Sequence, residues 1–181
     1  MYHVVQGNLL VSSTMGRFAM TKLKIAIAFL AAASCATAEA QTVQMMVLNQ
    51  AGAQTVLQAA ERSALQRNAP SAIAVVNPDG DLIAFQRMDG TRPASGDLAI
   101  QKARTAARLQ RPTAEIEDNV DNGRTAFITA DIMALRGGMP VRVNGEVVGA
   151  VGVAGLSKET DTEIAASAAA ALSTPSNKGR D

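Results

Sequence analysis

A glycine-rich segment of strand-forming residues places the strongest constraint on how this chain folds. The segment from Arg136 to Gly155 reads RGGMPVRVNGEVVGAVGVAG and contains six glycines in twenty residues. Asn144-Gly145 is the commonest two-residue turn signal, so the segment predicts a β-hairpin. Glycine weakens a strand through entropy and lost packing, and its repeated use therefore predicts that a helix, a second chain or a ligand comes close to the backbone.

Alternation along the second strand of this hairpin predicts two unlike faces. One face is expected to carry Val147, Gly149, Val151 and Val153, and the other, small throughout, Val148, Ala150, Gly152 and Ala154. Gly137 and Gly138 add a loop with unrestricted backbone angles at the hairpin's entrance. These glycines do not match a phosphate-binding loop, because no Lys and Ser/Thr follow them and no GxGxxG opens a helix.

The remaining sequence predicts a second hairpin and helices between the hairpins. The runs SAIAVVN and DLIAFQRMD flank the turn at 77–80, and both are apolar on successive residues, so both sheet faces are expected to be covered. Helices are expected at 43–67 with Met46 on the apolar stripe, at 97–110 with Ser95 as cap, from Thr113, and after a capping box at 160–163. This order predicts an α+β fold with a central antiparallel sheet rather than a parallel βαβ sheet.

The first forty residues are typical of a leader. Lys22 and Lys24, the apolar run IAIAFLAAA and the small-residue site AEA before Gln41 predict a signal peptide at 20–40, with 1–19 an over-extended start. A rival interpretation makes Cys35 a lipoprotein acylation site. Cleavage after Ala40 would leave one domain at 41–172 and a disordered tail at 173–181. No later apolar run reaches membrane-spanning length, so a periplasmic or secreted product is expected.

Composition after the expected cleavage excludes several kinds of chemistry. The only Cys, Cys35, and the only His, His3, both precede Gln41, so disulfides, cysteine nucleophiles, His-based triads and His metal sites are excluded from the mature chain. The 14 Lys and Arg after that point nearly balance the 15 Asp and Glu, and Phe85 and Phe127 are the only aromatics. No nucleic-acid partner is therefore expected.

Two opposite charges fall on helix faces that should point toward the sheet. Lys102 lies within the apolar sector of its helix, and Asp161 lies between Ala168 and Leu172 in angle. A buried unpaired charge costs several kcal/mol, so each needs a partner, a ligand or a route to water. Either Lys102 anchors an anion in a pocket with Asp161 pairing it or a ligand group, or the Lys102 tip reaches solvent and Asp161 serves the helix dipole as first residue after the cap.

Arg87 raises a similar question. Alternation along its strand places it on the face of Ile83 and Phe85. Its position near the strand end also allows a solvated strand terminus, and this interpretation is preferred.

Several motifs together resemble a known family. In order, VVNPDGDLIAFQRMDG, GDLAIQKARTAA, RPT, GGMPV, NGEVVGAVGVAG and DTEIA are similar to the GlcG/HbpS-like proteins, also called the haem-degrading domain family and found as the C-terminal part of some PduO proteins. Each motif alone is weak, but the ordered set is fairly specific and covers roughly Val43 to Leu172. The resemblance implies a profilin-like layered fold with helices on both faces of the sheet, assembly into homo-oligomers, and binding of haem or corrinoid, haem degradation or extracellular redox sensing.

The resemblance also implies a set of functional positions. The matching residues are Arg87, Asp97, Lys102, Thr105, Thr113, Gly137, Gly138, Pro140, Gly149, Gly152, Gly155 and Asp161, and Met139 completes the GGMP loop. The chain departs from the family where Asn77 replaces a common Asp and where no His remains as axial haem ligand. Iron would have to use Met, an oxygen ligand, Lys or water. Met88 and Met139 are candidates, although Met more often fills gaps in cores.

Three functions are compatible with these features. The preferred one is an exported module that holds a small anionic ligand, with haem as candidate, Lys102 as anchor and the GGMP loop as wall, in an accessory, carrier or redox-sensing role. The second is an enzyme acting on haem or a small catabolic metabolite, with Asp161, Lys102 or Asp97 for acid-base work. The third is a non-catalytic oligomeric accessory protein whose glycine-rich strand makes partner contacts.

Overall fold

The computed structural model describes residues 43–172. They form a fold around a four-stranded antiparallel sheet. The strands are β1 (Ala72–Val76), β2 (Leu82–Arg87), β3 (Gly138–Val143) and β4 (Glu146–Ala154), in the spatial order β2-β1-β4-β3. The expected leader, Cys35 and the tail from 173 lie outside the described residues.

Both predicted hairpins are present, and their turns have the backbone geometry that their sequences favour. Asn144 and Gly145 both have positive φ, 51° and 87°, which a tight two-residue hairpin turn requires. In the β1–β2 turn, Gly80 has φ +94° and the Asn77 backbone N–H donates to Asp81 O at 2.9 Å. The two hairpins join through the antiparallel pairing of β1 with β4.

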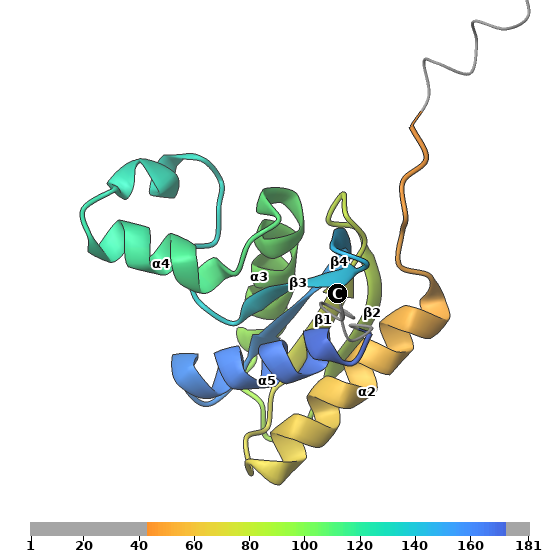
Figure 1. Ribbon diagram of the computed structural model, residues 1–181. Helices are drawn as coiled ribbons and strands as arrows, with labels where there is room; N and C mark the ends of the chain where they lie inside the picture. Colours follow the sequence, from red (N-terminus) through yellow and green to blue (C-terminus); the bar gives the residue numbers. More distant parts are fainter. Residues whose placement is uncertain (1–42, 173–181) are drawn as a thin grey trace, which may run out of the picture. The chain divides into compact units, whose positions relative to one another are not determined.

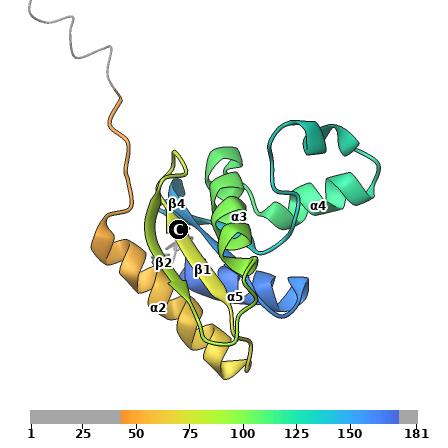
Figure 2. The ribbon, with the colours of Figure 1, turned by 180° about the vertical axis from the view of Figure 1, so that it is seen from behind.

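Helices cover both faces of the sheet, which confirms the predicted α+β architecture. Helices α2 (Gln50–Gln66) and α5 (Lys158–Ala170) pack on one face, and α3 (Ser95–Leu109) packs on the other (Figures 1 and 2). Helix α4 (Thr113–Asp121) and the short 3-10 helix η2 (Thr125–Thr129) follow α3 along the chain and lie to one side of it (Figure 1). Within the described residues, no helix has the length and apolar character needed to cross a membrane.

The two faces of the sheet contain different cores. The core under α2 and α5 is built from large aliphatic side chains such as Val56, Ile73, Val151 and Ile164, all fully buried. The core under α3 consists almost entirely of alanines, namely Ala72, Ala74, Ala99, Ala103, Ala106, Ala107, Ala150 and Ala154, together with Val76. The backbone of α3 therefore lies close to the strands.

This close approach explains Gly152 in β4 and Gly138 in β3. A Cβ atom added at Gly152 would collide with the backbone O of Ala99 and the backbone N of Ala103, both in α3. A Cβ at Gly138 in β3 would likewise collide with the backbone O of Lys102. The sequence predicted that a helix, a second chain or a ligand would approach this backbone, and at these two glycines the approaching element is helix α3.

The first predicted helix extends too far toward the N-terminus. Helix α2 begins at Gln50 because the Asn49 side chain caps it, accepting a hydrogen bond from Gly52 N at 2.8 Å. Upstream, Leu48 N donates to Val148 O at 2.8 Å, which ties this segment to β4. Met46 is 41% exposed and does not belong to the apolar stripe.

Two predicted helix caps are also wrong. Ser95 is the first residue of α3, and the N-cap residue Ala94 provides no side-chain hydrogen bond. Helix α5 is capped by Ser157, whose hydroxyl accepts from Thr160 N at 3.2 Å, so it starts three residues before the predicted start. Asp161 is therefore the fourth residue of the helix, still in its first turn, and not the first residue after a cap.

Two predictions about side-chain placement fail for local reasons. Strand β2 is an edge strand on which Leu82 and Phe85 remain 44% and 42% exposed, so the sheet is not covered on both faces there. Val148 joins the large aliphatic core instead of the small face, because the β3–β4 register shifts between Val141 and Arg142.

Candidate functional site

Two cavities lie along helix α3. The larger has a volume of about 630 Å³, within the usual range for small-molecule sites, and the smaller a volume of about 170 Å³. The larger cavity is lined by Gln101, Arg104, Thr105, Arg108, Leu109, Ile128, Ala130, Asp131, Ile132 and Met133. The smaller is lined by Arg92, Ala94, Ser95, Leu98, Lys102, Ala154, Gly155 and Asp161.

A buried ion pair lies beside the smaller cavity. Lys102 Nζ is 2.9 Å from Asp161 Oδ2 and also donates to Val153 O at 2.9 Å. The two side chains are only 5% and 7% exposed. The interpretation in which the Lys102 tip reaches solvent is therefore wrong, and the predicted pairing of Lys102 with Asp161 is present.

The interactions of the Asp161 carboxyl offset only part of the free-energy cost of burying it. Burial raises the pKa of this carboxyl above its ordinary value, and the opposing attraction of Lys102 only partly offsets the effect. Its Oδ1 atom is buried and has no hydrogen-bond partner, although the backbone N–H of Gly155 lies near enough to favour the ionised form. One oxygen of this carboxyl thus remains available to a hydrogen-bond donor.

The double-glycine loop packs directly against the ion pair. Gly137 has φ +114°, and a Cβ there would lie 2.9 Å from Asp161 Cβ and 3.1 Å from Lys102 Nζ. The next residue, Gly138, donates its backbone N–H to Thr113 Oγ1 at 2.8 Å. The structure therefore brings five of the predicted site residues into one cluster.

A second group of charges holds this loop in place. Arg136 donates to the carboxylates of Glu117 and Asp118 in α4, and Lys158 Nζ lies 3.9 Å from Glu117 Oε2. Glu117 is only 8% exposed. These contacts connect the loop before β3 with α4 and with the first residue of α5.

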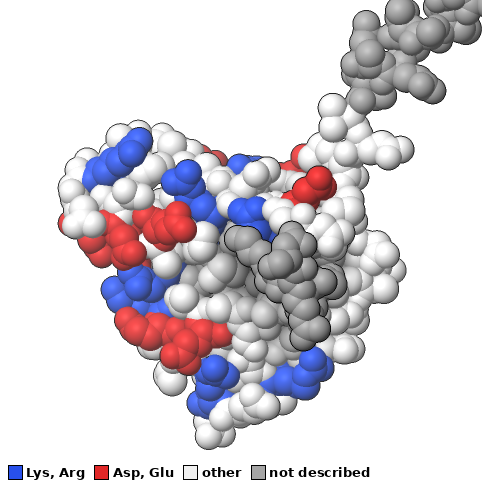
Figure 3. Space-filling view, in the orientation of Figure 1, with Lys and Arg blue, Asp and Glu red and all other residues white. Residues whose placement is uncertain are grey.

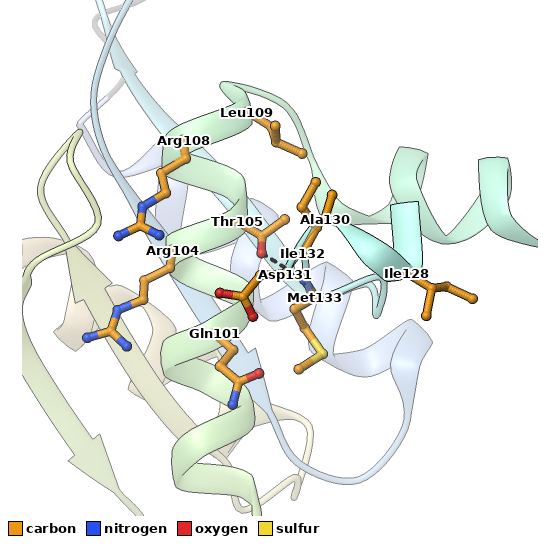
Figure 4. Close-up of a pocket in the computed structure, with 10 residues that line it drawn as sticks. All are labelled: Gln101, Arg104, Thr105, Arg108, Leu109, Ile128, Ala130, Asp131, Ile132 and Met133. Atoms are coloured by element: carbon orange, nitrogen blue, oxygen red, sulfur yellow. Dashed lines mark hydrogen bonds between the residues drawn. The ribbon is translucent and has the colours of Figure 1, made fainter. Parts of the chain in front are cut away.

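The larger cavity combines polar and apolar walls. Thr105 Oγ1 accepts a hydrogen bond from Met133 N at 3.0 Å, which fixes the segment after η2 against α3 (Figure 4). The Arg104 and Arg108 guanidinium groups extend from α3 on the side away from Ile128. Their Nε atoms donate to the β1–β2 turn, at 3.1 Å to Gly80 O and 2.9 Å to Asp79 O.

Other predicted site residues lie outside both cavities. Arg87 is exposed and donates to Thr91 O at 2.9 Å, and Asp97 is exposed in the first turn of α3. Met139 is partly buried against the aliphatic core, and Pro140 is buried within β3. A ligand-binding role for these four residues stays a prediction.

No sequence pattern pointed to most of the larger cavity. Residues 128–133 belong to η2 and the loop after it, which have neither a helical nor a strand period in their apolar residues. Arg92 was missed in the smaller cavity because it stands in a loop before Pro93. Among residues 43–172, no group of three or more His, Cys, Asp or Glu could hold a metal ion.

An antiparallel sheet packed tightly beneath one helix, with cavities along that helix, defines a small α+β domain suited to ligand binding. More specifically, the chain belongs to the HbpS-like family, because the model of that family, described as haem degrading protein HbpS-like, matches residues 48–170. This confirms the resemblance drawn from the ordered motifs.

Similar proteins of known sequence or structure support this family assignment. Protein GlcG of Escherichia coli K12 is 42% identical over 109 residues, covering 60% of this chain and 81% of that protein. The crystal structure of HbpS superposes with a TM-score of 0.68 at 30% identity, covering 74% of this chain and 95% of HbpS. A crystal structure of a PduOC:heme complex superposes with a TM-score of 0.64 at 27% identity, covering 70% and 96%.

Proposed function

We propose that this protein is an exported ligand-binding protein that holds haem or a related tetrapyrrole in the larger cavity. The observation that carries the proposal is the composition of that cavity. The open cavity of about 630 Å³ is lined by apolar side chains, among them Leu109, Ile132 and Met133, and by polar ones that include Arg104 and Arg108. Haem is a flat apolar ring with two carboxylates, so such a lining suits it. That a relative has been solved as a heme complex supports the same ligand.

Iron coordination can be tested against the residues that are present. The described residues contain neither His nor Cys, and Met88 and Met139 are packed against the aliphatic core. Met133 lines the larger cavity, and its thioether is the soft donor there. Bound haem would supply redox-active iron, with Met133 as candidate ligand and the two arginines near the carboxylates.

Binding fits the structure better than acid-base catalysis. Lys102 and Asp161 are paired with each other and buried, and Asp97 is exposed outside both cavities. A carrier, accessory or redox-sensing role therefore has more support than an enzyme. The face in Figure 3 carries acidic and basic side chains in neighbouring positions rather than a patch of one sign, so specificity would come from the cavity lining.

Export and homo-oligomer formation are further parts of the proposal. The signal-like segment at 20–40 supports export, which mass spectrometry of the exported product would test through its N-terminus. The exposed apolar residues Leu82 and Phe85 on edge strand β2 support contacts between copies, which sedimentation at several concentrations would test.

The test is titration of the full chain with haemin, recorded through the Soret band. We expect a saturable shift of the band that is weakened at least tenfold in the Arg104→Gln/Arg108→Gln variant and unaffected by Arg111→Gln, a control at an exposed arginine beyond the end of α3. Thermal melting of each variant shows whether loss of the turn hydrogen bonds has unfolded the protein. Absence of any band shift in the wild type would remove haem as the ligand.

The iron ligand and the type of activity have separate readouts. Met133→Leu should move the Soret maximum, whereas Met139→Leu, which removes a thioether outside the cavity, should not. An unchanged spectrum in Met133→Leu would reject the thioether ligand. A spectrum that is stable with a reductant supports a carrier or sensor, and steady bleaching would favour the enzyme.

A further inference from the structure

The smaller cavity contains a carboxylate oxygen whose hydrogen-bonding capacity is unused. The Asp161 side chain is 7% exposed, its Oδ2 atom pairs with Lys102, and its Oδ1 atom has no partner. Asp161 is also one of the residues that line the cavity. A buried acceptor without a donor is costly, so the cavity favours an occupant that can donate a hydrogen bond to Oδ1.

The rest of the cavity favours a negative charge on the same occupant. Lys102 and Asp161 form an ion pair without net charge, so Arg92, whose guanidinium donates to Gly155 O at 2.6 Å, gives the lining residues a net positive charge. The cavity also borders the start of α3, where Ala94 provides no side-chain cap and the Ser95 N–H donates to Arg92 O at 3.1 Å. A guanidinium beside the start of a helix is suited to binding a carboxylate.

The volume of the cavity suits a small occupant. A volume of about 170 Å³ corresponds to roughly six water molecules, and therefore to about six non-hydrogen atoms. We propose that the smaller cavity binds a short 2-hydroxycarboxylate, whose hydroxyl donates to Asp161 Oδ1 and whose carboxylate accepts from Arg92 and from the first turn of α3. An ammonium group in place of the hydroxyl is disfavoured, because Lys102 Nζ already lies 2.9 Å from the other oxygen of Asp161.

Calorimetric titration of the full chain with three matched compounds tests this assignment. Lactate carries the carboxylate and the hydroxyl, propionate lacks the hydroxyl, and alanine replaces the hydroxyl with an ammonium. We expect lactate to bind at least tenfold more tightly than either of the others, which corresponds to about 1.4 kcal/mol. Equal affinity for lactate and propionate would show that Oδ1 does not select the ligand, and no binding of lactate would overturn the site.

Variants separate this site from the haem proposal, on which it does not depend. Arg92→Gln should weaken lactate binding at least tenfold, and thermal melting checks that loss of its hydrogen bond to Gly155 O has not unfolded the protein. Arg111→Gln, at an exposed arginine outside the cavity, should leave binding intact. Leu98→Phe should block the cavity without removing a charge. Unchanged lactate affinity in both cavity variants would place the ligand elsewhere. Arg104→Gln/Arg108→Gln should change haemin binding alone, so the two proposals can fail independently.

Discussion

The two faces of the sheet are packed by opposite means. Beneath α2 and α5, branched side chains such as Ile73, Val151 and Ile164 fill the space between the layers. Beneath α3, alanines and glycines let helix and strand backbones come together, and the one buried lysine there, Lys102, ends in an ion pair. The stability of the first face therefore depends on side-chain volume. The stability of the second face depends on small side chains that leave room for the α3 backbone, and on the pairing of its buried charges.

The largest predicted effect comes from breaking the ion pair on the α3 face. Lys102→Met would leave the Asp161 carboxylate buried without its partner, which typically costs about 3–5 kcal/mol of unfolding free energy. The double variant Lys102→Met/Asp161→Leu should recover much of this loss, because it removes both charges. Urea denaturation measures both, with Lys158→Met at a 54% exposed side chain as control. A loss below 1 kcal/mol in Lys102→Met would mean that the pair is not isolated from water.

Adding one methyl group to the same face should be the next most damaging change. Gly152→Ala would push a Cβ into the backbone of α3, and we expect a loss of about 3 kcal/mol. Gly96→Ala makes the same substitution within α3, where the nearest atom, Phe85 Cζ, lies at an ordinary 3.5 Å. This control should be neutral or slightly stabilising in thermal melting. If the two variants melt alike, close backbone approach does not explain the glycine.

Removing one methyl group from the aliphatic face should cost less. Ile164 is fully buried in the core under α2 and α5, and Ile164→Val should lose about 1 kcal/mol through reduced burial and imperfect refilling. Ala103→Val, which adds volume on the α3 face, should cost more than this when both are measured by urea denaturation. The reverse ranking would contradict the proposed difference between the faces.

The final prediction concerns the pH dependence of stability. Because burial raises the pKa of Asp161, the folded state binds its proton more tightly than the unfolded chain, even with Lys102 and Arg92 nearby. The resulting stability is present below the unfolded-state pKa of about 3.9 and is lost as the pH rises through the folded-state value. The melting temperature of wild type minus that of Asp161→Asn should therefore fall as the pH is raised from 4.

The control for this pH series is Asp97→Asn, which removes an exposed carboxylate from α3. A wild-type advantage that grows with pH in the Asp161→Asn comparison would mean that the attraction of Lys102 outweighs burial.

Much of the fold could be predicted because its signals are local. The Asn144-Gly145 turn and the apolar periodicity of the helices identified the hairpins and the helices, and the angle of Lys102 on its helix placed its charge inward. Asp161 was placed inward too, although the start of its helix was assigned three residues late, because Ser157 and Thr160 both offer capping hydroxyls. The apolar period of the helix therefore placed Asp161 correctly even though the predicted cap was wrong.

The rest depended on contacts that sequence patterns do not encode. The register shift at Val141 and Arg142 moved Val148 to the other core, and no local signal marks such a bulge. The wall of the larger cavity comes from residues 128–133, which are held against α3 by the Met133–Thr105 hydrogen bond. A site built across irregular backbone in this way becomes visible only in three dimensions.

The central pairing of β1 with β4 also sets the order in which the protein can assemble. Each hairpin closes across a short turn, so it can form quickly from neighbours in the sequence. Joining the hairpins encloses α3, α4 and η2 within one long loop, whose closure entropy slows the folding reaction. We therefore expect Lys102 and Asp161 to lose their hydration only when this long loop closes, at the slowest step of folding.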